Sequence, residues 1–287
     1  MFMEKICWAN TDNFDEAEFV IVGIPDESQS HAQRKGTEEA PFKIRQISNQ
    51  RDSYERNEKI IPGRPFQGIE KKVHDIGNIN REQIETIYGK ISESSKIPIS
   101  IGGDHSITSQ IINTMTKTLG KISLVYFDAH PDFVSSTTNY YGSVLHDIFS
   151  NIEIESSVEI GIRTPEQEEL DNIVKCNLSV VTPFDIAEKG IEQVANSVLD
   201  GLGDNVYVSF DMDCIDPAYA PGVSVPVPLG LNSVDAVYLL QKIAKKGLVG
   251  MDVMEVCPSF DVKDRTSHLA SRLISEVIYS SGEKTLD

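Results

Sequence analysis

The chain has 287 residues, a mass of 31.8 kDa and a formal net charge of −18, with a sequence pI near 4.7. So acidic a protein is poorly suited to nucleic-acid phosphates or anionic membrane surfaces, and it suits a cationic substrate or metal ions better. No apolar run approaches the ~20 residues that span a bilayer, the first residues do not resemble a signal peptide, and the four cysteines are scattered. We therefore expect a cytoplasmic protein.

Eight short apolar segments are predicted to be strands, and several are continuous Ile/Val-rich runs typical of a parallel sheet buried on both faces. In chain order they cover residues 18–23, 73–77, 97–103, 122–130, 158–163, 178–182, 205–213 and 248–256. Helices are predicted between them over 81–94, 106–119, 185–202, 234–246 and 266–281. This alternation predicts one three-layer α/β/α domain over 1–287, with a mostly parallel, doubly wound sheet.

Polar clusters follow four of these predicted strands. They are IGGDHS (101–106), FDAHPDF (127–133), SFDMDCIDP (209–217) and DVMEVCP (252–258). Ligands of an open parallel sheet bind beyond the carboxyl ends of its strands, so we expect the four clusters to converge there. Carboxylates massed in one crevice resist ionisation unless cations are present, and the sequence therefore predicts a metal site.

The candidate ligands are mainly carboxylates, with two imidazoles among them. They are His105, Asp128, His130, Asp132, Asp211 and Asp213. Such hard ligands suit Mn²⁺ better than a Cys-rich zinc site would. Six ligands are too many for a single catalytic ion that keeps open positions, whereas two ions ~3.5–4 Å apart with a shared hydroxide use them naturally.

The segments GGDHSIT, DAHPD, SFDMDCIDPAYAPG and DVMEVCP, in this order and spacing, resemble the ureohydrolase family of arginases and agmatinases. The resemblance spans nearly the whole chain. RKGTEEAPFKIRQIS (34–48), VHDIGNI and TSHLASRL are similar to further elements of that family. The resemblance implies an arginase-like fold and a cofactor of two Mn²⁺ ions per chain. It also implies a homo-oligomer, because the family commonly forms trimers or hexamers.

The resemblance also implies roles for individual residues. One Mn²⁺ would be held by His105, Asp128, Asp132 and Asp211, and the other by His130, Asp128, Asp211 and Asp213. In the family a hydroxide attacks the guanidinium carbon, and the tetrahedral intermediate collapses to urea and an amine. Asp132 would accept the hydroxide proton and deliver it to the leaving amine, and Glu255 would bind the guanidinium group.

The sequence departs from the family pattern in two places. Family members usually carry a catalytic histidine downstream of DAHxD. The corresponding segment of this chain is NYYGSVLHDIF (139–149), where either Tyr141 or His146 could take that place. The usual GTGTPxxGGL loop is GVSVPVPLGL (222–231), which makes the entrance more apolar. His31 is interpreted as a structural or surface residue, although its loop could reach the site.

The wording of the motifs is closer to agmatinases, so the predicted reaction is agmatine to putrescine and urea, a step of polyamine biosynthesis. Residues 135–139 match no pattern for holding an α-amino acid, as an arginase would need. Arginase, guanidinobutyrase and other guanidino-acid hydrolases are the enzyme alternatives. A metallophosphoesterase is disfavoured because GDxxD and GNHD motifs are absent from the sequence. A metal-binding pseudoenzyme or regulatory subunit remains the alternative of another class.

Overall fold

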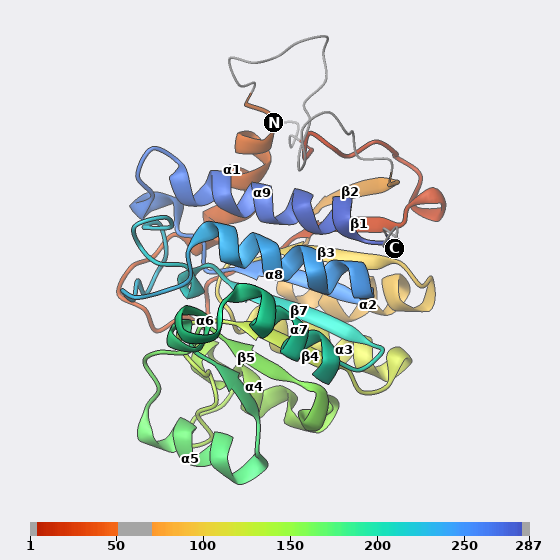
Figure 1. Cartoon of the computed structure of the whole chain (residues 1–287). Coiled ribbons are helices and arrows are strands. Elements are labelled where there is room, and N and C mark those ends of the chain that lie inside the picture. Colours follow the sequence, from red (N-terminus) through yellow and green to blue (C-terminus); the bar gives the residue numbers. More distant parts are fainter. Residues whose placement is uncertain (1–4, 51–70, 283–287) are drawn as a thin grey trace.

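The computed structural model describes residues 5–50 and 71–282, which form an α/β structure around one eight-stranded sheet (Figure 1). The strands are β1 Phe19–Gly23, β2 Val73–Asn78, β3 Ile97–Ile101, β4 Ser123–Phe127, β5 Val158–Ile160, β6 Ser179–Val181, β7 Val206–Asp211 and β8 Gly250–Met254. Their order is β2-β1-β3-β8-β7-β4-β5-β6, and every pairing between them is parallel. The prediction of a doubly wound parallel sheet is confirmed.

Helices cover both faces of the sheet (Figure 1). Their bounds are α1 Ala40–Ser48, α2 Ile84–Glu93, α3 Ile107–Leu119, α4 Val144–Ile148, α5 Gln167–Cys176, α6 Pro183–Lys189, α7 Ile191–Gly201, α8 Ser233–Lys246 and α9 Arg265–Ser280. Buried residues of α1, α7, α8 and α9 share one apolar core with the sheet, and those of α2, α3 and α4 share a second. This is the expected three-layer arrangement.

One predicted helix is divided in two. The segment 185–202 was expected to be continuous, but α6 ends at Lys189 and α7 begins at Ile191. Gly190 separates them with φ of 83°, a left-handed conformation that glycine adopts without the steric cost of a side chain. Helix α6 also begins two residues earlier than the predicted start at Asp185. The side chain of Thr182 caps it, and Pro183 occupies its first turn.

A buried ion pair joins α1 to β2 at the edge of the sheet. Arg45 Nη2 lies 2.9 Å from Asp75 Oδ1, and Arg45 Nε donates to Asp75 Oδ2 at 2.9 Å. Both side chains are almost completely buried. Asp75 also accepts the backbone N–H groups of Ile6 and Gly77 at 2.8 and 2.9 Å. This network therefore fixes three segments that are distant in sequence.

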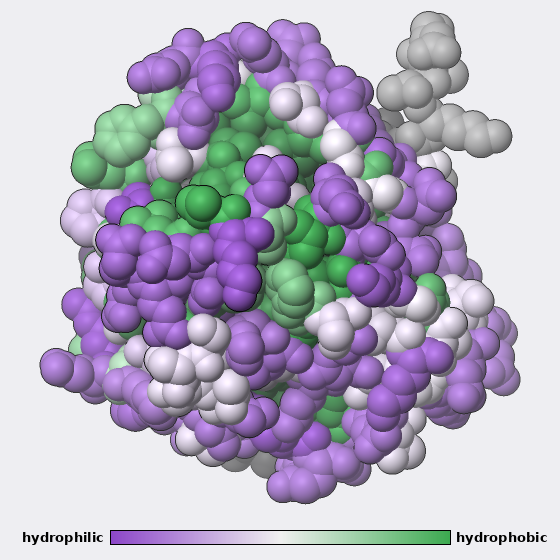
Figure 2. All heavy atoms as spheres, turned by 90° about the horizontal axis from the view of Figure 1, so that it is seen from below, coloured by the Kyte–Doolittle hydropathy of each residue, from purple (hydrophilic) through white to green (hydrophobic). Residues whose placement is uncertain are grey.

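None of the helices in the described ranges is long and apolar enough to cross a membrane. Figure 2 shows a face on which hydrophilic side chains predominate, with hydrophobic ones visible between them. A face rich in hydrophilic side chains is compatible with most of the acidic residues being hydrated.

Candidate metal centre

Four adjacent strands in the middle of the sheet bring the candidate residues together. These strands are β3, β8, β7 and β4, in that spatial order. His105 and Asp128 follow β3 and β4, whereas Asp211 is the last residue of β7 and Glu255 follows β8. All four side chains are buried. Strands β3 and β4 are consecutive in the chain, but β8 and β7 lie between them in the sheet. The site therefore lies at a change in strand order, where parallel α/β sheets commonly bind ligands.

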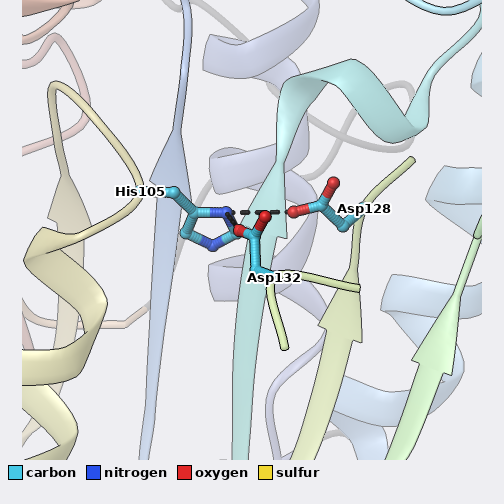
Figure 3. Close-up of side chains that lie close together, drawn as sticks. All are labelled: His105, Asp128 and Asp132. Atoms are coloured by element: carbon cyan, nitrogen blue, oxygen red, sulfur yellow. Dashed lines mark ion pairs between the residues drawn. The ribbon is translucent and has the colours of Figure 1, made fainter. Parts of the chain in front are cut away.

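The first cluster is centred on the imidazole of His105 (Figure 3). Its Nδ1 atom lies 3.0 Å from Asp128 Oδ2, 3.3 Å from Asp132 Oδ2 and 3.1 Å from Asp211 Oδ2. A single imidazole nitrogen cannot donate to three carboxylates at once. His105, Asp128 and Asp132 have their ligand atoms close enough together to hold one metal ion.

The second cluster contains Asp128, His130 and Asp213, whose ligand atoms could hold another ion. His130 Nδ1 lies 3.4 Å from Asp128 Oδ1 and 3.1 Å from Asp213 Oδ2. Its side chain is 26% exposed, so this cluster is nearer to solvent than the first. The two oxygens of Asp128 face different clusters, and this carboxylate is therefore placed to join them.

The carboxylates strongly perturb one another. Burial and the nearby Asp128 charge raise the pKa of Asp132 to about 7. Burial, followed by the charges of Asp213 and Asp128, raises the pKa of Asp211 well above its usual range. Although burial opposes protonation, the neighbouring carboxylates raise the pKa of His130 to about 12. Such a site binds protons in place of cations, and divalent ions would relieve the same repulsion.

A further observation supports a metal ion at this site. Asp128 Oδ2 is buried and, although it faces His105, it has no hydrogen-bond partner among the described residues. Buried carboxylate oxygens are normally satisfied. A cation beside Asp128 would satisfy this oxygen, and oxygen and imidazole donors together are typical ligands of Mn²⁺ and similar metals.

Three residues that sequence analysis missed hold His105 in place. Its Nε2 atom lies 2.9 Å from Ser209 Oγ, which donates to Asp252 Oδ1 at 2.8 Å. The Tyr126 ring stacks on the imidazole at 4.7 Å, and its hydroxyl donates to Asp132 at 2.6 Å. A detectable signal was present, because polar residues at buried positions of predicted strands need partners.

Glu255 is buried beside the first cluster. It accepts the backbone N–H of His105 at 2.9 Å and a short hydrogen bond from the Ser224 hydroxyl. Burial raises its pKa to about 8 despite these hydrogen bonds. Glu255 and Asp132 both have left-handed backbones, with φ of 63° and 49°. This conformation is unusual for residues other than glycine, and such strain concentrates at functional sites.

The structure places Tyr141 and His146 differently. Tyr141 is partly buried, and its pKa is raised by burial and by the charges of Asp132 and Glu255. His146 lies on α4, and among the described residues no hydrogen bond or ion pair connects it to either cluster. His31 does reach this region, because its ring stacks on Tyr140 at 5.0 Å and meets Tyr141 edge-on at 6.0 Å.

Known proteins resemble this chain in both sequence and fold. A model of the arginase family matches residues 17–279. An agmatinase of Cronobacter sakazakii is 33% identical over 94% of this chain and 89% of its own length. One from Neisseria meningitidis serogroup C is 34% identical over 71% of this chain, and the match spans only 66% of that relative. The agmatine ureohydrolase structure from Thermoplasma volcanium has a TM-score of 0.83 and 30% identity, covering 98% of this chain and 94% of the other. The proclavaminate amidino hydrolase of Streptomyces clavuligerus has a TM-score of 0.87 and 26% identity, covering 98% and 97%.

Proposed function

The chain belongs to the arginase family, and we propose that it is a ureohydrolase that cleaves agmatine to putrescine and urea with two Mn²⁺ ions. The observation that carries this proposal is the pair of clusters joined by Asp128, with Glu255 buried beside them. The agmatinases among its relatives support agmatine as the substrate. Bound divalent ions would supply an activated water near neutral pH and stabilise developing negative charge.

The protein's own side chains would then bind and orient the substrate. Glu255 is the proposed partner of the guanidinium group, because Ser224 and the His105 backbone fix its carboxylate beside the metal ligands. A planar guanidinium can donate two parallel hydrogen bonds to such a carboxylate. Binding the cation also favours the ionised form of Glu255, whose pKa burial otherwise raises to about 8.

Asp132 is the proposed proton carrier to the leaving amine. Its Oδ2 atom lies 3.3 Å from His105 Nδ1 in the first cluster, where a carboxylate beside the bound water could accept a proton and pass it on. The Tyr126 hydroxyl holds one of its oxygens at 2.6 Å and so fixes the direction of the carboxylate. Tyr141 is the proposed wall of the site at the position of the family histidine.

Urea release from a panel of guanidino compounds tests this proposal. Purified protein supplied with Mn²⁺ should release urea fastest from agmatine, and more slowly from 4-guanidinobutyrate and arginine. The control is Glu255→Gln, which retains the side-chain volume but should lose most of the activity. Faster hydrolysis of arginine or 4-guanidinobutyrate would replace agmatine as the substrate.

A non-catalytic role is the alternative of another class, favoured by the tyrosine at the family's histidine position. A pseudoenzyme would bind Mn²⁺ but release no urea from any compound in the panel. We further propose a homo-oligomer, a trimer or hexamer, which light scattering of the purified protein would test.

A further inference from the structure

Arg163 contacts the backbone of the second metal cluster, and the proposed reaction does not use it. It follows β5, the strand next to β4, and it is partly buried. A guanidinium group has five N–H donors, and here every one of them meets a backbone carbonyl oxygen. The acceptors are Gly161 and Cys214 for Nη1 at 2.9 and 3.3 Å, Asp213 and Val227 for Nη2 at 2.7 and 2.6 Å, and Pro228 for Nε at 3.0 Å.

The surroundings of this guanidinium group are unusual for a cation. In the described part of the chain no carboxylate lies within ion-pair distance of Arg163, so carbonyl dipoles alone offset its charge. The packing is also close, since a Cβ atom at Gly230 would lie 2.8 Å from Arg163 Nη2. A planar group with five donors in fixed directions is suited to joining several chain segments rigidly. We infer that joining segments is the purpose of Arg163.

The guanidinium group joins two segments that border the site. One is the 3-10 turn Met212–Cys214, which follows β7 and contains the second-cluster residue Asp213. The other is the loop 222–231, which contributes its carbonyls at 227 and 228. The end of this loop is also bound to the turn, because Leu231 N–H donates to Cys214 O at 2.9 Å. The loop therefore supports the turn from the side that the guanidinium group faces.

The backbone of Arg163 contacts the other half of the second cluster. Its N–H donates to Ala129 O at 2.9 Å, and Ala129 lies between Asp128 and His130 in the chain. Ala129 N–H in turn donates to Asp213 Oδ1 at 3.0 Å. Arg163 is thus hydrogen-bonded at Asp213 through its side chain and beside Asp128 and His130 through its backbone. These three residues make up the second cluster.

We propose that Arg163 is a positioning residue for the second metal ion, because it fixes the turn that carries Asp213 relative to Asp128 and His130. This inference rests on the proposed function, since it concerns one of the two Mn²⁺ ions. The ligands come from two separate strand ends, and tight binding requires their atoms to be held in place by neighbouring groups. Removing a group that orients a metal ligand typically costs 10–100-fold in metal affinity.

Two competing explanations predict different results. If only the charge of Arg163 mattered, its removal would tighten Mn²⁺ binding, since a nearby cation repels the ion. If Arg163 only stabilised the fold, its removal would lower the free energy of unfolding and leave the affinity of the folded protein for both ions unchanged. A positioning residue instead affects the second ion alone.

The experiment measures Mn²⁺ binding by calorimetry in wild type, Arg163→Met and Arg163→Lys. We expect Arg163→Met to weaken the binding of the second ion by about tenfold or more. Arg163→Lys should also weaken it, because an ammonium group keeps the charge but has only three donors and cannot span the same carbonyls. Arg163→Lys provides the same test if Arg163→Met does not fold, which denaturant unfolding of the metal-free proteins would reveal.

Arg34→Met is the matched control on the same loop. Arg34 is also partly buried, and its Nη1 donates to Val223 O at 3.4 Å. In the described part of the chain it has no hydrogen bond to the turn that carries Asp213, so its loss should change the affinity for the second ion by less than about twofold. Both variants remove one positive charge near the loop.

A second background isolates the first ion. His130→Asn removes a ligand of the second cluster only. Adding Arg163→Met to His130→Asn should therefore leave the affinity for the remaining ion within about twofold. This comparison separates an effect on one cluster from a general loosening of the metal centre.

Three results would overturn the role of Arg163. They are an unchanged affinity for the second ion in both Arg163 variants, a tighter affinity in Arg163→Met, and an equal loss of affinity for both ions. Any of these, obtained with an active wild type, leaves the proposed function intact. Conversely, a wild type that binds two ions but hydrolyses no guanidino compound would contradict the proposed function and not the role of Arg163.

Discussion

Metal-binding imidazoles depend on what holds their second nitrogen, and in this protein Ser209 and Asp252 hold His105. With a metal ion on Nδ1, which faces the carboxylates, Nε2 would carry the proton and donate to Ser209. Ser209 in turn donates to Asp252, whose other oxygen accepts the Tyr207 hydroxyl at 2.8 Å. The chain of hydrogen bonds thus fixes both the tautomer and the direction of the imidazole.

We expect Ser209→Ala to lower Mn²⁺ affinity about 10–100-fold, the usual effect of removing a group that orients a metal-bound histidine. Metal titration monitored by calorimetry would measure this. Tyr207→Phe is the control, because it removes a hydrogen bond to Asp252 but leaves the contact with Ser209. Equal affinities of Ser209→Ala and the wild type would show that His105 needs no such support.

We propose Tyr141, rather than His146, for the position of the family histidine. The charges of Asp132 and Glu255 act on Tyr141 and help to raise its pKa. His146 lies on α4, and among the described residues no hydrogen bond or ion pair links it to the clusters. A positioned acid or base typically contributes 10²–10⁴-fold in rate. Tyr141→Phe should therefore lower kcat toward the lower end of this range, about 10²-fold, since a phenol with a raised pKa shuttles protons poorly.

His146→Ala is expected to leave kcat within about threefold of wild type. Metal content measured in parallel separates lost catalysis from lost metal. A larger loss in His146→Ala than in Tyr141→Phe would reverse the assignment. If both variants retain wild-type kcat, Asp132 and solvent carry the proton without either residue.

At the scale of elements, strands were easier to predict than their side-chain partners. All eight predicted strands occur, because continuous apolar runs bounded by polar residues are distinctive in a parallel sheet. The four polar strand ends meet because β3, β8, β7 and β4 are neighbours. That adjacency is a property of the topology, which local sequence does not encode.

Other features depend on contacts between distant segments. The attachment of Glu168 to Ser135 and Ser136 joins α5 to a loop more than thirty positions earlier. The sequence shows there only an acidic residue and two serines. The left-handed backbone of Glu255 is equally hidden, since no local signal marks it. By contrast, the division at Gly190 had a visible signal in the glycine itself.

The buried ion pair of Arg45 and Asp75 should contribute strongly to the packing of α1 against β2 and so to the stability of the fold. Asp75→Asn leaves the Arg45 charge buried without its partner, and removing one partner of a buried pair typically costs about 3–5 kcal/mol in free energy of unfolding. Denaturant unfolding would measure the loss. The exposed pair of Glu85 and Lys117 provides the control, because Glu85→Gln should have a much smaller effect.

The same pair gives a dependence of stability on pH. Burial raises the pKa of Asp75, but the hydrogen bonds and charge of Arg45 outweigh burial, so its pKa lies below the ordinary value of 3.8. The ionised form therefore stabilises the fold above this value, and the contribution is lost as the pH falls through the lower folded-state pKa. Wild type should thus lose more stability than Asp75→Asn between about pH 5 and pH 2. Parallel curves for the two proteins would contradict this.

At the scale of the whole molecule, the negative charge has both a general and a local part. The net charge is −18, and five buried carboxylates gather at the carboxyl ends of the central strands. The resemblance to the arginase family is confirmed by the family match. The single domain over 1–287 and the cytoplasmic location stay predictions, as do the roles of individual site residues.

The number of bound ions follows from how the sheet assembles the two clusters. Asp128 belongs to both clusters, whereas His130 belongs only to the second. We therefore expect two ions per chain in the wild type, loss of both in Asp128→Asn, and loss of one in His130→Asn. Elemental analysis after dialysis against metal-free buffer would count them. Metal binding should also stabilise the fold, by about 2.7 kcal/mol per site at a free concentration one hundred times Kd. Chelation should therefore lower the Tm of the wild type more than that of Asp128→Asn. A fully active wild type with one ion per chain would exclude the binuclear centre.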